Sequence, residues 1–190
     1  MSASTPDTIE TSHVLAKGFI ETSATTLGLY FRLSEDPEIR HVNFKVPVGF
    51  DWEVSSIVIA GPSDTIIFTC AFDPNQLIRH IEKIISEVPE ENNFIRGFVK
   101  EYCNQVAGPV KAKLSKVGME TGLSLAFASK GYATEWFQPR SEESVYKNWI
   151  LEFNNSSLYC SLEIDIASTF TEDDFNTKYD ENELGAITFL

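Results

Sequence analysis

Two stretches of this 190-residue chain, IVIAGPSDTIIFTCAF (residues 57–72) and WILEFNNSSLYCSLEI (residues 149–164), align without a gap at an offset of 92 residues. Their apolar positions coincide, and the run Gly61-Pro62-Ser63-Asp64 in the first falls opposite the centre of the second. β-Branched and aromatic residues on both sides of a turn are typical of a β-hairpin. We therefore predict two hairpins, one with strands at 55–60 and 65–72 and one over 149–164.

A long helical pattern precedes each hairpin. The segment ETSHVLAKG (10–18) falls against EYCNQVAGP (101–109) at an offset of 91 residues. The two predicted helices, roughly 5–27 and 93–117, each end at a glycine and are followed by a predicted strand, at 29–33 and 121–129. Helix, strand and hairpin thus occur twice in the same order, which indicates an internal repeat. Residue identity between the copies is low, so coincidence among ordinary α+β elements stays open.

The predicted fold is an α+β domain in which an antiparallel sheet packs with two long helices related by a pseudo-two-fold axis. The length favours one core and one domain over residues 1–190. Its parts are half-copies at roughly 5–73 and 90–166, a linking helix at 74–87 and an acidic C-terminal extension at 167–190. A short strand is expected at 42–46 and a long loop at 130–144.

The charge of the chain limits its partners. A formal net charge of −13 argues against nucleic acid and against anionic membranes, because Lys and Arg hold both. No apolar run approaches the ~20 residues that span a bilayer, and the N-terminus lacks the pattern of a signal peptide, so a cytoplasmic protein without membrane insertion is expected. The acidic extension is either a solvated tail or a surface that docks onto a basic partner.

The three cysteines, Cys70, Cys103 and Cys160, are scattered without a CxxC pair or a Cys/His cluster. No metal site and no disulfide framework can be read from that spacing, so we expect buried thiols and no metal.

The helix predicted at 93–117 has one apolar and one polar face. At about 100° per residue, Glu101 and Asn104 project away from the apolar stripe, and their i, i+3 spacing makes them neighbours. Gly97 and Gly108 lie on the same outward line, although glycine inside a helix costs roughly 1 kcal/mol relative to alanine. Bare backbone beside the pair would let another protein approach closely. An ordinary solvated face, or glycines that admit the other long helix, are the alternatives. The stripe consists of Ile95, Phe98, Val99, Tyr102, Val106, Val110, Leu114 and Val117.

The octapeptide EYCNQVAG, with Glu101, Asn104 and Gly108 in the pattern E-x-x-N-x-x-x-G, resembles the signature of the CheC/CheX/FliY chemotaxis phosphatases. The resemblance implies a protein-aspartyl-phosphate phosphatase whose substrate is a phosphorylated response regulator of the CheY kind. It also implies that Asn104 orients the attacking water and that Glu101 pairs with a lysine of the regulator. No cofactor is expected on this chain, since the magnesium ion would belong to the regulator.

The first half-copy has Glu10 and His13 where the second has Glu101 and Asn104, and Lys17 replaces the glycine. We interpret this pair as a degenerate second site. By analogy with CheX-like proteins, a homodimer through an exposed strand edge is expected. Two other functions stay open. The first is a noncatalytic module that binds a response regulator or a flagellar-switch component through the same helix face. The second is a small-molecule sensor, which no specific residues of the sequence indicate.

Overall fold

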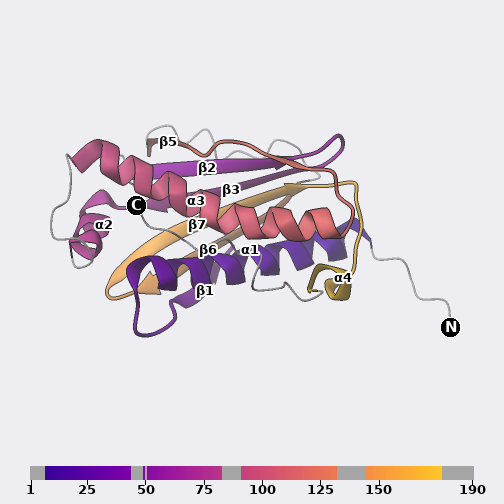
Figure 1. The fold of residues 1–190 in the computed structure, drawn as a ribbon. Coiled ribbons are helices and arrows are strands. Elements are labelled where there is room, and N and C mark those ends of the chain that lie inside the picture. The colour runs from indigo at the N-terminus through magenta and orange to yellow at the C-terminus, as the bar shows by residue number, and fades with distance from the viewer. Residues whose placement is uncertain (1–6, 44–48, 50, 83–90, 132–143, 177–190) are drawn as a thin grey trace.

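The computed structural model describes residues 7–43, 49, 51–82, 91–131 and 144–176. Within them the chain forms one seven-stranded antiparallel sheet and helices that pack on it (Figure 1). In chain order the elements are α1 (Thr8–Phe31), β1 (Glu38–Val42), β2 (Glu53–Ala60), β3 (Thr65–Phe72), α2 (Pro74–Ile81), α3 (Glu91–Lys116), β4 (Gly122–Leu123), β5 (Phe127–Lys130), β6 (Val145–Phe153), β7 (Ser156–Asp165) and α4 (Glu172–Asn176).

Both predicted hairpins are confirmed, and they form the centre of the sheet. The strand order is β1-β6-β7-β3-β2-β4, with β5 pairing beside β4 on β2. In the first hairpin Ile57 pairs with Phe68, and 92 residues later Trp149 pairs with Cys160 in the second. The gapless alignment of the two sequences is therefore also an alignment of their hydrogen-bonding registers. The second hairpin turns through two residues with positive φ, at Asn154 and Asn155, which suits a tight two-residue turn.

The ladder between β3 and β7 joins the two hairpins symmetrically. Thr69 lies opposite Ser161 in this ladder, and these two residues are themselves 92 apart. A pseudo-two-fold axis through this pair exchanges the hairpins. The outer strands obey the same symmetry. Strand β1 of the first repeat pairs with β6 in the second hairpin, and strand β5 of the second repeat pairs with β2 in the first hairpin. The register supports the half-copies, while their bounds at 5–73 and 90–166 stay a prediction.

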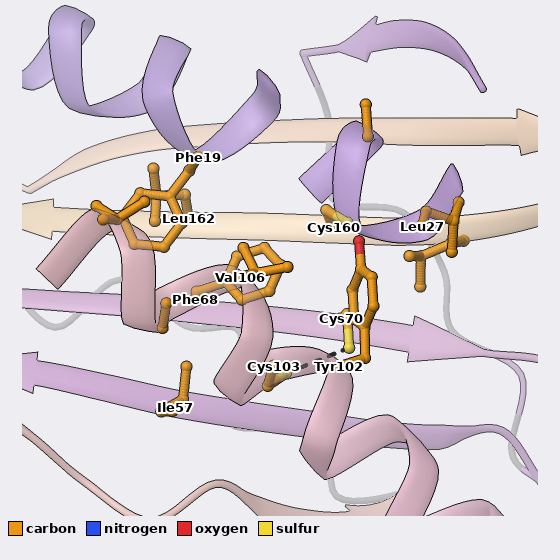
Figure 2. Packing of buried hydrophobic residues seen from close by; sticks show 14 of the residues in the cluster. Phe19, Leu27, Ile57, Phe68, Cys70, Tyr102, Cys103, Val106, Cys160 and Leu162 are labelled. Atoms are coloured by element: carbon orange, nitrogen blue, oxygen red, sulfur yellow. Dashed lines mark hydrogen bonds between the residues drawn. The ribbon is translucent and has the colours of Figure 1, made fainter. Parts of the chain in front are cut away.

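Helices α1 and α3 lie side by side on one face of the sheet (Figure 1). Helix α1 begins after Asp7, whose side chain accepts a hydrogen bond from the backbone N–H of Glu10. Figure 2 shows Phe19 of α1 and Val106 of α3 directed toward Phe68 and Leu162 of the sheet, and Phe19 stacks on Phe68 with ring centroids 5.5 Å apart. These contacts form one hydrophobic core between the helices and the sheet.

The strand predicted at 29–33 is wrong, because α1 continues through Gly28 to Phe31. The helix ends at Arg32, which has a left-handed conformation (φ 48°) and donates its backbone N–H to the carbonyls of Gly28 and Leu29. Tyr30 packs on Phe98 of α3 (4.9 Å between ring centroids), and Phe31 packs on Phe153 of β6 (5.3 Å). The helical spacing buries both rings against α3 and β6, and this packing outweighs their preference for strands.

Three other predicted elements differ from the structure. The first short strand lies at Glu38–Val42, ahead of the predicted 42–46, and residues 44–48 are outside the described residues. The strand predicted at 121–129 is divided into β4 and β5, with the highly exposed Leu125 between them. The linking helix begins at Pro74 as predicted, with Asp73 as its cap, and ends at Ile81, while 83–90 are not described. Most of the predicted loop at 130–144 is likewise outside the described residues.

Candidate docking face on helix α3

The predicted apolar stripe of α3 faces the sheet. Six of its eight members are buried, and Phe98 and Val117 are half-buried against the same core. Tyr102 is fully buried, and its hydroxyl donates a hydrogen bond of 2.9 Å to the backbone carbonyl of Ser23 in α1. The adjacent Cys103 is also buried, with its sulfur 3.4 Å from that of Cys70 in β3 (Figure 2). These contacts with α1 and β3 fix the rotation of α3 about its axis.

That rotation places the predicted pair on the outer surface. Glu101 is exposed and Asn104 is partly exposed. The side-chain amide of Asn104 donates to one carboxylate oxygen of Glu101 (Nδ2 to Oε2, 3.1 Å), and that of Gln105 donates to the other (Nε2 to Oε1, 2.7 Å). Both oxygens of the carboxylate are thus held by amides one turn further along the helix. Gln105 is a member of the site that was not among the predicted residues, although its i, i+4 spacing from Glu101 is the signal that identifies it in the sequence.

Gly97 and Gly108 leave open space on either side of this pair. A methyl group placed on the Cα of either residue would meet no atom within 4 Å, apart from the neighbouring turns of the helix itself. The glycines are therefore not explained by packing against α1. Bare backbone flanks Glu101 and Asn104, and a partner surface approaching α3 meets no side chain at these two positions.

The end of α1 contributes a third group near the site. Burial and the negative charge of Glu101 raise the pKa of the Tyr30 phenol above its usual range. Tyr30 therefore stays protonated and neutral at physiological pH, and Glu101 gains no negatively charged neighbour from it. The last turn of α1, over residues predicted to form a strand, brings Tyr30 to this place.

The counterpart pair in α1 shares the pattern of exposure but not the surroundings. Glu10 and His13 are exposed and the two residues between them are buried, as around Glu101 and Asn104. One turn on, where α3 has Gly108, α1 has Lys17, which forms an ion pair with Glu172 of α4. The structure thus brings the two predicted pairs to similar faces of α1 and α3, with bare backbone beside only one of them.

Within the described residues, no three or more side chains of the His, Cys, Asp and Glu types are grouped as metal ligands. Over the same residues, no helix combines the length and the apolar character that crossing a membrane requires.

The sequence matches no family model and no curated protein. The fold, in contrast, matches solved structures. A CheC-like superfamily protein from Shewanella sp. PV-4 aligns over 80% of this chain and 97% of its own, with a TM-score of 0.65 and 15% identity. The CheX–CheY–BeF3–Mg complex from Borrelia burgdorferi matches over 80% and 97%, with a TM-score of 0.63 and 14% identity. FliY from Thermotoga maritima matches over 85% and 91%, with a TM-score of 0.51 and 16% identity.

Proposed function

We propose that this chain, which has the fold of CheC-like and CheX proteins, is a protein-aspartyl-phosphate phosphatase whose substrate is a phosphorylated CheY-like response regulator. The observation that carries the proposal is the exposed pair Glu101 and Asn104, hydrogen-bonded to each other and flanked by the open backbone of Gly97 and Gly108. A flat helix face of this kind lets a carboxylate and an amide reach into a site on another protein.

The reaction requires positioning more than covalent chemistry. A water attacks phosphorus in line with the bond to the aspartyl oxygen, that bond breaks, and inorganic phosphate and the free carboxylate are formed. One N–H of Asn104 is engaged by Glu101, which fixes the plane of the amide, and the carbonyl oxygen Oδ1 accepts a hydrogen bond from the water and orients the lone pair of the water toward phosphorus. Asn104 therefore acts by orientation, without taking up the proton.

Glu101 serves as the docking anchor in this proposal. Its carboxylate would exchange the amide of Gln105 for a lysine ammonium of the regulator, because a carboxylate is bound more strongly by a charged donor than by a neutral amide. The bond from Asn104 can persist through this exchange, since it uses the other oxygen. The docked Glu101 would then hold Asn104 in a fixed position beside the phosphoryl group.

The metal in this reaction would belong to the regulator, where it neutralises charge on the phosphoryl group. The solved CheX–CheY–BeF3–Mg complex supports a partnership of this kind for the fold.

The decisive experiment mixes the purified chain with phosphorylated regulators of the same cell and times the loss of phosphate. The wild type should accelerate hydrolysis, and Asn104→Ala should lower the rate roughly 100-fold while binding is retained, because orientation of the water is lost. His13→Ala is the matched control in α1 and should leave the rate unchanged. Binding without faster hydrolysis in the wild type would instead identify a noncatalytic docking module.

A further inference from the structure

The segment Ile166–Asn176, here called the C-terminal strap, leaves β7 at the edge of the helical layer and ends in α4. In Figure 1, α4 lies beside the N-terminal half of α1 and the C-terminal half of α3, and it packs against both helices. Three sets of contacts hold the strap.

The first anchor is Asp64, in the turn between β2 and β3. Its carboxylate is buried, with 6% of the residue exposed, and it accepts hydrogen bonds from the backbone N–H groups of Ala167 and Ser168, both at 3.0 Å. The hydroxyl of Ser168 donates a further bond of 2.9 Å. A carboxylate that accepts three such bonds out of solvent fixes the start of the strap against the sheet.

The second anchor is Thr11, fully buried in α1. Its hydroxyl oxygen accepts the backbone N–H of Phe170 at 3.2 Å and also lies 3.2 Å from the carbonyl oxygen of Phe170. Thr171 then caps α4 through reciprocal hydrogen bonds with Asp174. The strap therefore meets α1 through buried polar contacts, followed by a short and well-capped helix.

The third anchor is the ring of Phe175, which fills a notch at Gly18 of α1. A methyl group on Gly18 would come within 2.6 Å of this ring, so the close approach depends on glycine. On the other side the ring stacks on Phe170 at 5.5 Å, and the ammonium of Lys113 in α3 lies 4.9 Å from its centroid. Phe175 thereby contacts α1 and α3 at the same time.

The strap also makes a contact on the exposed face of α1. Glu172 forms an ion pair with Lys17, one turn beyond His13. Lys17 and Gly18 correspond, at the offset of 91 residues, to Gly108 and Pro109 in α3, where the surface is open. The strap thus covers the turn of α1 at Lys17 and Gly18, whereas the corresponding position of α3, Gly108, is open to a partner.

We propose that the C-terminal strap is a built-in occupant of the α1 face: it covers the turn at Lys17 and Gly18 beside the exposed pair Glu10 and His13, so that a partner cannot approach that pair closely, and docking is confined to α3. Each chain then engages one partner through Glu101 and Asn104. This second statement rests on the proposed function, whereas the closure of the α1 face does not.

Hydrogen exchange on the full chain tests the closure. The amides of Ala167, Ser168 and Phe170 should exchange at least about 100-fold more slowly than unstructured amides, and the double variant Asp64→Ala/Phe175→Ala should bring them within about 5-fold of that limit. The single variant Asp64→Asn retains the shape of the anchor and provides a second measurement if the double variant does not fold. Fast exchange of these three amides in the wild type would overturn the proposal.

Binding stoichiometry tests the confinement to α3. Native mass spectrometry with a regulator activated by beryllofluoride should give one regulator per chain, and Glu101→Ala/Asn104→Ala should abolish the complex. A one-to-one complex that survives in this variant would show that α1 is open and overturn the confinement. A wild-type chain that binds no regulator would contradict the proposed function instead, while the exchange rates still decide the closure.

Discussion

The hydroxyl of Tyr102 donates a hydrogen bond of 2.9 Å to the backbone carbonyl of Ser23, and the side chain of the same serine accepts the indole N–H of Trp149 at 3.1 Å. Ser23 thus links α3, α1 and β6 at one buried point. Tyr102 is the neighbour of Glu101 in sequence, so this bond contributes, together with the buried apolar stripe of α3, to the direction in which the exposed pair projects.

Tyr102→Phe should destabilise the protein by about 1 kcal/mol, because one buried hydrogen bond is lost while the ring still packs. Urea unfolding followed by circular dichroism measures this change. The phosphatase rate should stay within about 3-fold of the wild type, since the remaining stripe of α3 still faces the core. A fall as large as that of Asn104→Ala would mean that Tyr102 alone holds the pair in position.

Gly97→Leu should have opposite effects on stability and function. Because leucine is the better helix former and nothing lies within 4 Å, the free energy of unfolding should rise by roughly 0.5–1 kcal/mol. The new side chain would obstruct a partner, so KM for the phosphorylated regulator should rise while the fold is strengthened. Steady-state kinetics and thermal unfolding of the same sample measure both.

Gly18→Ala is the matched control for that substitution, since it also replaces a helical glycine. Here the methyl group would meet the ring of Phe175, so stability should fall instead of rising. Equal stability changes at the two positions would contradict the contrast between an open and a covered glycine.

Glu53→Gln should destabilise the protein strongly. The carboxylate is 1% exposed and forms ion pairs with Lys130 of β5 and with Arg96 of α3, so its removal leaves two cations without their buried partner. The expected loss is about 2 kcal/mol in denaturant unfolding, since two charge-assisted contacts are lost while both cations stay partly exposed to water. Arg40→Ala breaks the exposed pair with Glu152 and should change stability by less than about 1 kcal/mol.

Stability should decline in alkaline solution. Burial is the main cause that raises the pKa of Cys70 and Cys160 above their ordinary value of 9.0 and that of Tyr30 above 10.0. The unfolded chain releases these protons first, so stability is fully present below about pH 8 and falls as the pH rises through 9 and 10. Unfolding measured from pH 7 to 11 should show this slope. Tyr30→Phe should reduce the slope above pH 10.

The homodimer stays a prediction. The edges of the sheet are β1 on one side and β4 with β5 on the other, and Ile39 on β1 is exposed. Light scattering should give twice the mass of the 21.3 kDa chain, and Ile39→Lys should lower that mass if β1 is the contact. A mass of one chain at all concentrations would exclude the dimer.

Local sequence patterns were sufficient to predict the two hairpins, their common register and the outward direction of Glu101 and Asn104. Each of these follows from local periodicity, because side chains alternate along a strand and recur every 3.6 residues along a helix. The alignment at an offset of 92 residues agrees with the structure because the two hairpins pair their strands in the same register.

The end of α1 and the position of the strap depend instead on contacts between distant parts of the chain. Residues 29–33 have apolar and aromatic side chains that suit a strand as well as a helix, and the choice depends on Phe98 and Phe153, which lie far away in the sequence. The contacts of Asp64 with Ser168, and of Gly18 with Phe175, likewise join residues more than 100 positions apart. Local patterns contain no information about such neighbours, because the free energy that selects them comes from packing between distant segments.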